Sequence, residues 1–178
     1  LGFSLTEEAM TLAIVGVLTS LAVPSLRDVT RNSRMTTEVN AFMAILNAAR
    51  SEAVKRGQRV RFCPSRDGRS CAGADSDYTW WHEGAILFVD SNNNIQLDDG
   101  ETLVAVLQGI GGELTIKTSP ARRSVSYLPN GFSTGTNLTF AFCDPRGAAA
   151  IRYVFVSNTG RPRIAREDRE SWQNSLRQ

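Results

Sequence analysis

An apolar run near the N-terminus constrains this chain more than any other feature of the sequence. Residues 9–23 are almost continuously apolar, and residues 3–24 together supply the roughly 20 residues that an α-helix needs to cross a bilayer. Two adjacent carboxylates, Glu7 and Glu8, precede this run. Because a charge in hydrocarbon costs about 2.5–3.5 kcal/mol on insertion scales, these carboxylates need either a counter-charge or access to water.

The helical pattern continues beyond Pro24. Apolar residues recur at spacings of four and three, which predicts an amphipathic helix with a core-facing stripe: Met35, Val39, Phe42, Leu46, Ala49 and Ala53. We therefore expect one helix over about residues 3–55, kinked near Pro24. Its first half is apolar on every side and suits a membrane or a bundle of like helices. Its second half suits contact with a soluble domain.

The start of the sequence carries a resemblance to a known class of proteins. Gly2, the motif FSLTE after it, the apolar run and the motif AVPS resemble the N-terminus of type IV prepilins and type II secretion pseudopilins. The resemblance implies that a prepilin peptidase cuts between Gly2 and Phe3, that Phe3 is then N-methylated, and that residues 1–2 are the remnant of a leader. It also implies that Glu7 pairs with the Phe3 amine of a neighbouring subunit in a filament, and that Pro24 kinks the helix. A plain signal anchor is the alternative interpretation.

After Gly57 the period of the sequence changes from helical to strand-like. Seven short β-rich runs follow, separated by turn signals: RVRFC, GAILFVD, ETLVAVL, ELTIK, SVSYL, NLTFAFC and IRYVFVS. One long helix followed by these runs predicts an α+β fold in which the helix packs on an antiparallel sheet. The expected organisation is a membrane or filament-core half of the helix over residues 3–25, an amphipathic half over 26–57, a β domain over 58–164 and a charged tail over 165–178.

The order of several motifs over nearly the whole chain resembles the GspH/FimT family of minor pilins and pseudopilins. The motifs are AARSEAVKRGQRVRFCPSRDGRSC, WWHEGAILFVDSNNN, DDGETLV, YLPNGF and TFAFCDPRGAAAIRYVFVSNTGRPRI. The resemblance implies a pilin-like fold and a structural subunit for the assembly or initiation of a type IV pilus, not an enzyme, and no cofactor. It implies a single span in the bacterial inner membrane, a periplasmic C-terminal domain, and other pilins or pseudopilins and the prepilin peptidase as partners. A GspH-like minor pseudopilin of a type II secretion system is the alternative.

The three cysteines suit one disulfide and one free thiol in an oxidising compartment. Cys63 and Cys71 bracket a loop that is short enough for a disulfide to close, which leaves Cys143 free. A bond from Cys143 to either of the other two cysteines is the competing connectivity.

Aromatic residues gather around the single histidine of the chain. Tyr78, Trp80 and Trp81 could stack on bases or sugars, but an aromatic cluster just before a strand is more often the edge of a core. Because His82 is the only histidine, a His-based metal site and a Ser-His-Asp triad are both disfavoured.

One polar segment, DSNNNIQLDDGE, carries oxygen-bearing side chains at the spacing of an EF-hand-like loop: Asp90, Asn92, Asn94, Gln96, Asp98 and Glu101. Ile95 stands where that loop requires glycine, and no helix is expected on either side. A polar hairpin connection explains the same residues. We therefore expect no metal site, with calcium as the weaker alternative.

A basic motif lies near the C-terminus. Residues 160–163 read Gly-Arg-Pro-Arg, and in the FimT branch a glycine-arginine-x-arginine motif is associated with DNA binding during natural transformation. The resemblance implies that Arg161, Arg163 and Arg166 contact the phosphates of double-stranded DNA. The net charge of +2 is too small to indicate a nucleic-acid-binding protein by itself. A solvated strand end, paired with the acidic residues that follow, is the alternative.

Overall fold

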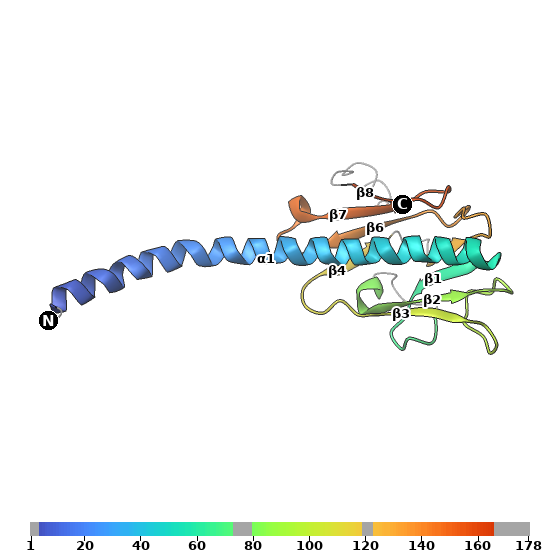
Figure 1. Cartoon of the computed structure of the whole chain (residues 1–178), viewed down its shortest axis with the longest axis horizontal. Helices are drawn as coiled ribbons and strands as arrows, with labels where there is room; N and C mark the ends of the chain where they lie inside the picture. Colours follow the sequence, from blue (N-terminus) through green and yellow to red (C-terminus); the bar gives the residue numbers. More distant parts are fainter. Residues whose placement is uncertain (1–3, 73–79, 119–122, 166–178) are drawn as a thin grey trace. The chain divides into compact units, whose positions relative to one another are not determined.

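The structure is a computed structural model that describes residues 4–72, 80–118 and 123–165. The chain divides into two compact units, Leu1–Thr37 and Glu38–Gln178. Helix α1 (Leu5–Arg56) begins in the first unit and ends in the second, as Figure 1 shows. The predicted helix is therefore present, and it continues without interruption through Pro24.

In the first unit, α1 carries large apolar side chains that remain exposed in the described part of the structure. From Leu5 to Val29 their exposed fractions lie between 45% and 84%: Leu5, Met10, Leu12, Ile14, Val15, Val17, Leu18, Val23, Leu26 and Val29. By length and composition this part of the helix is apolar enough to cross a membrane. A helix that is apolar all round and exposed needs an apolar environment from outside the chain.

The C-terminal part of α1 has the amphipathic character that the sequence predicts. All six residues of the predicted stripe are buried, with exposed fractions of 3% or less. The helix ends at Gly57, whose φ of 63° is the left-handed conformation that commonly follows a helix. Lys55 and Arg56 occupy the last turn, where positive charge is favourable beside the helix carbonyl groups.

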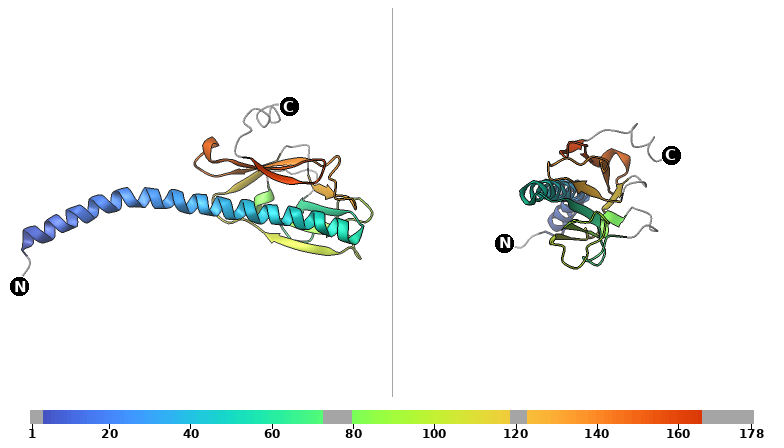
Figure 2. Two further views of the ribbon diagram at one scale, coloured as in Figure 1. Left: turned by 45° about the horizontal axis from the view of Figure 1, so that its top comes forward. Right: turned by 90° about the vertical axis from the view of Figure 1, so that its right-hand side faces the viewer.

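Within the described residues, the second unit contains two antiparallel sheets of four strands each (Figures 1 and 2). The first sheet has the order β3-β2-β1-β5 and contains β1 (Val60–Pro64), β2 (Gly84–Val89), β3 (Leu103–Gln108) and β5 (Val125–Tyr127). The second has the order β4-β6-β7-β8 and contains β4 (Thr115–Thr118), β6 (Leu138–Cys143), β7 (Arg152–Val156) and β8 (Pro162–Ala165). Two 3-10 helices, η1 (Trp80–Glu83) and η2 (Ala148–Ala150), lie between strands along the chain.

The side chain of Phe42 lies at the centre of the core of the second unit. Its ring centroid is 5.3 Å from that of Phe62 on β1 and 4.7 Å from that of Phe140 on β6, so one α1 residue contacts both sheets. The ring of Trp81 on η1 packs edge-to-face on Phe140 at 4.8 Å. Burying a phenylalanine contributes about 1.5–3 kcal/mol, and edge-to-face aromatic pairs add to this.

The seven predicted β runs correspond to β1 through β7, and the α+β fold is confirmed. Two features differ from the prediction. The strands form two sheets, whereas the sequence suggested one. An additional strand, β8, pairs with β7 through Val156↔Pro162 and Phe155↔Arg163. Proline is tolerated in β8 because β8 is an edge strand, and N–H groups on its outer side have no neighbouring strand in the sheet to which they would donate.

Candidate functional site

The first candidate site is the N-terminal part of α1. Glu7 and Glu8 lie in its first turn, where negative charge is favourable beside the free N–H groups. The Glu7 amide donates to the carbonyl oxygen of Ser4 at 2.9 Å, and both carboxylates are exposed. Gly2 and Phe3, the predicted processing residues, lie outside the described residues.

The hydroxyl groups in this part of the helix are paired locally. Thr19 Oγ1 donates to the carbonyl oxygen of Val15 at 2.8 Å, and Ser20 Oγ donates to that of Val17 at 2.7 Å. Such back-bonding satisfies a hydroxyl within its own helix. The segment can therefore enter an apolar environment without leaving these donors unpaired.

The second candidate site is the basic motif around β8. Arg161 precedes β8 and Arg163 lies within it, and both side chains are exposed. Arg163 lies opposite the half-buried Phe155 of β7. Because side chains alternate along a strand, Arg161 and Arg163 fall on one face. Arg166, the third residue of this prediction, lies outside the described residues.

The turn before this motif is held by main-chain and side-chain contacts. The Ser133 amide donates to the carbonyl oxygen of Asn158 at 2.9 Å, which joins the β5–β6 connection to the β7–β8 turn. Arg50 of α1 donates from Nε to the carbonyl oxygen of Gly131 at 3.1 Å. Helix, connection and turn are thus tied together next to Arg161.

The predicted disulfide is present and joins Cys63 to Cys71. Cys63 is fully buried and packs with Ile86 and Phe88, and Cys71 packs against this cluster from the loop. Within that loop the Asp67 carboxylate accepts a hydrogen bond from the Ser70 hydroxyl at 2.7 Å. It also accepts hydrogen bonds from the main-chain amides of Arg69 and Ser70 and from the Ser65 hydroxyl. These hydrogen bonds hold the pKa of Asp67 well below its usual range, and the bond from the Ser70 hydroxyl has the largest effect.

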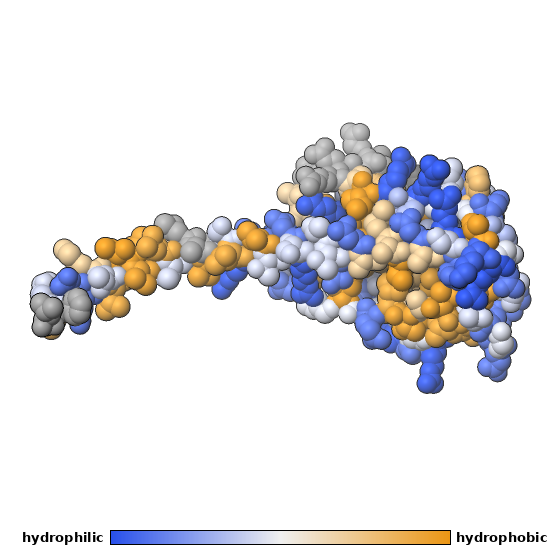
Figure 3. Space-filling model, in the orientation of Figure 1, coloured by the Kyte–Doolittle hydropathy of each residue, from blue (hydrophilic) through white to orange (hydrophobic). Residues whose placement is uncertain are grey.

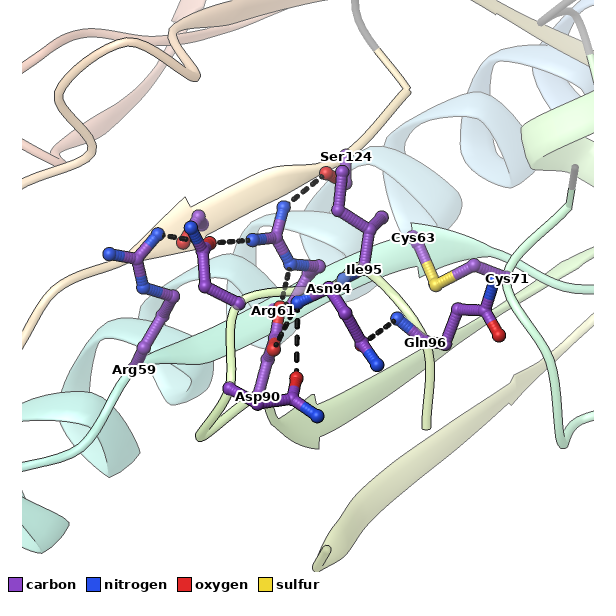
Figure 4. Close-up of polar contacts among 12 residues, drawn as sticks. Arg59, Arg61, Cys63, Cys71, Asp90, Asn94, Ile95, Gln96 and Ser124 are labelled. Atoms are coloured by element: carbon purple, nitrogen blue, oxygen red, sulfur yellow. Dashed lines mark hydrogen bonds and ion pairs between the residues drawn. A yellow bond between two sulfur atoms is a disulfide. The ribbon is translucent and has the colours of Figure 1, made fainter. Parts of the chain in front are cut away.

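A buried ion pair between Arg61 of β1 and Asp90 is the main feature that sequence reasoning missed (Figure 4). The exposed fractions of the two residues are 3% and 0%. Arg61 also donates to Ser124 Oγ at 2.9 Å and to Asn93 Oδ1 at 2.7 Å, and the Asn94 amide donates to Asp90 Oδ1 at 3.2 Å. An arginine between apolar residues in a strand, together with an aspartate directly after the next strand, was the available signal.

The loop considered for calcium is held by its own donors. Asp98 Oδ2 accepts hydrogen bonds from the side-chain amides of Asn92 at 2.7 Å and Asn94 at 2.6 Å. Glu101 Oε1 accepts a hydrogen bond from the main-chain amide of Ser91 at 2.8 Å. The carboxylates that a calcium ion would require therefore already accept hydrogen bonds from the protein. No group of three or more His, Cys, Asp or Glu side chains that could hold a metal ion is found in the described ranges.

The remaining candidates are core or half-buried residues. Trp81 is buried among the aromatic rings of the core, as the core interpretation predicts. The side chains of Tyr78 and Trp80 lie outside the described part of the structure. Cys143 is a free, half-buried thiol at the end of β6, and burial raises its pKa.

The sequence matches a known family over most of the chain. The family described as "Type II transport protein GspH" matches residues 38–160. The chain belongs to the GspH family. This match covers the part of α1 that carries most of the buried stripe, and both sheets up to Gly160.

Relatives of this GspH-family chain include pilins. It is 28% identical over 177 residues to the pilin-like protein PilA1 of Thermus thermophilus, in a match that covers 92% of this chain and 97% of that protein. Two crystal forms of the type IV minor pilin FimU of Pseudomonas aeruginosa PAO1 have a similar fold at 22% identity. The match to the P21 form covers 76% of this chain and 91% of the crystallised FimU chain with a TM-score of 0.57, and the match to the P65 form covers 73% and 91% with a TM-score of 0.50. The chain is therefore a GspH-family protein with a pilin-like fold.

Proposed function

We propose that this protein is a minor subunit of a type IV pilus. It is anchored in the bacterial inner membrane by the N-terminal half of α1, is processed by a prepilin peptidase between Gly2 and Phe3, and enters the filament through the same helix half. The observation that carries the proposal is an α-helix whose described large apolar side chains between Leu5 and Val29 are exposed, with two carboxylates in its first turn.

Glu7 sets the register of this helix in the filament. Within a bundle of apolar helices its carboxylate would pair with the Phe3 amine of the next subunit. Removing one partner of a buried ion pair costs about 3–5 kcal/mol. The pair therefore favours only the axial position in the filament at which the carboxylate meets the amine. Before assembly the carboxylate lies about two turns from the start of the helix or less, where it can remain hydrated at the membrane surface.

The full-length chain, expressed with a complete set of pilus proteins, tests this proposal through Glu7→Ala. We expect the amount of Glu7→Ala protein in sheared filaments to fall about 100-fold or more, because about 1.4 kcal/mol corresponds to tenfold. Glu8→Ala is the matched control, since it removes the adjacent carboxylate from another side of the helix, and it should assemble normally. Equal incorporation of the Glu7→Ala and wild-type proteins contradicts the proposal, and mass spectrometry of the mature chain should show a methylated Phe3.

A GspH-like minor pseudopilin of a type II secretion system is the nearest alternative, supported by the family match. Deleting the gene separates the two functions. Loss of surface pili supports the pilus subunit, whereas intact pili with exported enzymes retained in the periplasm support the pseudopilin.

We propose DNA-backbone binding as a second function of the β8 motif. The exposed side chains of Arg161 and Arg163 support it, because two guanidinium groups on one face can contact successive phosphates. Two contacts give weak, salt-dependent and sequence-independent affinity. The detergent-solubilised chain should shift duplex DNA at low salt, Arg161→Gln with Arg163→Gln should abolish the shift, and Arg69→Gln on the disulfide loop should not. The absence of a shift at low salt contradicts this second function.

A further inference from the structure

The edges of the two sheets differ in how they are protected against pairing with another strand. An edge strand exposes unpaired N–H and C=O groups, and proteins usually protect it with charged residues, proline, a bulge or a very short length. In the second sheet, β8 contains Pro162 and Arg163, and the four-residue β4 contains Lys117. In the first sheet, β5 has only three residues.

Strand β3 has little of this protection. Its six residues read LVAVLQ, with no charge and no proline. Its pairing with β2 shifts register between Leu87 and Phe88, and it is regular from Ala105 to Gln108. No strand in the described part of the chain pairs with its outer edge, and β3 is the outermost strand of its sheet in Figure 1.

The side chains of β3 make this edge apolar on both faces. Leu103 and Val106 have exposed fractions of 41% and 42%. Ala105 and Leu107 lie opposite Leu87 and Ala85 of β2, on the face that packs toward α1. Figure 3 shows an apolar patch over β2 and β3 beside the C-terminal part of α1. A strand added beyond β3 would place alternate side chains against this patch and against Val106.

We propose that the outer edge of β3 accepts an extended segment of another pilin subunit as an additional strand. Main-chain hydrogen bonds to β3 would supply the attachment, and alternate apolar side chains of the segment would give the specificity that is typical of strand addition. The segment is expected to be uncharged over about four residues, the length of the regular part of β3. The identity of the partner as a pilin subunit rests on the function proposed above, whereas the open edge itself does not.

The direction of the strands disfavours a second copy of this chain as the partner. α1 turns back at Gly57 into β1, β2 is antiparallel to β1, and β3 is antiparallel to β2, so β3 runs opposite to the C-terminal part of α1. Antiparallel pairing of two β3 strands would point the two α1 helices in opposite directions. All subunits of one polar filament have the same orientation, so two copies of this chain within a filament cannot pair in that arrangement.

Val106→Lys tests the proposal in the full-length chain, co-expressed with the other pilus subunits. A charge on the edge should lower the amount of this chain in sheared filaments at least about fivefold. Ile164→Lys is the matched control, because Ile164 has a similar exposed fraction of 46% but lies on the protected β8 edge. It should assemble within about twofold of wild type. Hydrogen exchange provides a second measurement, in which the β3 amides of the wild-type chain should exchange about tenfold more slowly in filaments than in detergent, while the β8 amides should not change.

Each outcome decides the proposal. Normal assembly of Val106→Lys together with unchanged exchange at β3 overturns strand addition and leaves the pilin function intact. If wild-type protein does not enter filaments, the pilin function and the partner named here both fail. A detergent-solubilised dimer that Val106→Lys dissociates identifies a second copy as the occupant and also overturns the proposal. Should Val106→Lys fail to fold, the exchange measurement on the wild-type chain decides.

Discussion

Gly160 and Gly131 approach so closely that a Cβ atom on Gly160 would lie 2.0 Å from the carbonyl oxygen of Gly131. Gly160 ends the β7–β8 turn and Gly131 lies in the β5–β6 connection, so two turns are in direct main-chain contact. The Gly131 carbonyl oxygen also accepts a hydrogen bond from the Arg50 guanidinium of α1. This contact fixes the start of the segment that carries Arg161 and Arg163.

Gly160→Ala should destabilise the second unit by about 3 kcal/mol. The φ of Gly160 is 72°, which costs an L-residue about 1–2 kcal/mol, and separating the two turns adds about 1–3 kcal/mol. Gly135→Ala is the matched control, because Gly135 has a similar φ of 78° with nothing within 4 Å of the added Cβ. Urea unfolding of the detergent-solubilised chain, followed by tryptophan fluorescence, measures both, and equal losses would show that the contact between the turns is not rigid.

Arg61→Leu should lower the free energy of unfolding by about 3–5 kcal/mol, since it leaves the Asp90 carboxylate buried without its cation. The loop after β2 should also become less ordered, because Asp90 accepts a hydrogen bond from the Asn94 amide in that loop. Arg66→Gln, which breaks the more exposed pair with Glu83, is the control and should cost less than about 1 kcal/mol. The same urea titration compares them, and a similar small loss for both variants would mean that the buried pair is replaceable.

The elements that periodicity determines could be predicted from the sequence. The buried stripe from Met35 to Ala53 and the strands β1 through β7 follow from the spacing of apolar residues, which depends only on which face of an element is buried. The division into two sheets could not be predicted, because strand partners are chosen by three-dimensional packing. Phe42 shows this, since no local pattern indicates that its ring contacts both β1 and β6.

The parts of the candidate sites that depend on contacts between distant residues were also missed. The Arg61–Asp90 pair joins residues from two different parts of the chain, and a charged pair in a core runs against the rule that buried positions are apolar. Gly131 and Gly160 each look like an ordinary turn glycine, and their mutual approach makes Gly160 more costly to replace than its φ alone would. The cysteine pairing was accessible, because a short loop favours closure between its own ends.

Replacing both Cys63 and Cys71 with alanine should lower the stability of the second unit by about 2–3 kcal/mol, the contribution expected for closing a short loop. For a unit of this size the melting temperature should fall by roughly 6–12 °C. Cys143→Ser is the control, because Cys143 is outside the disulfide. This substitution should change the free energy of unfolding by about 1 kcal/mol or less. Calorimetry of oxidised wild type against the variants tests this, and an unchanged melting temperature for the double variant would mean that the hydrogen bonds to Asp67 maintain the loop without the disulfide.

Asp67→Ala should destabilise the protein at pH 7 and have a smaller effect in acid. Hydrogen bonds from the Ser70 hydroxyl and from nearby amides lower the pKa of Asp67 in the folded state. A lowered pKa contributes stability above the unfolded value of about 3.9, and this contribution is lost as the pH falls from there toward the folded value. Because Asp67 is exposed, solvent screening limits the effect at pH 7 to about 1 kcal/mol or less.

Urea unfolding of wild type and Asp67→Ala at about pH 7, pH 3 and pH 2 measures this dependence. The difference in unfolding free energy between the two proteins should shrink steadily below about pH 4. Asp99→Ala, which removes another exposed carboxylate, is the control and should change the free energy of unfolding at pH 7 by about 0.5 kcal/mol or less. A difference for Asp67→Ala that is the same at both ends of this pH range would mean that the side chain acts through the shape of the disulfide loop and not through its charge.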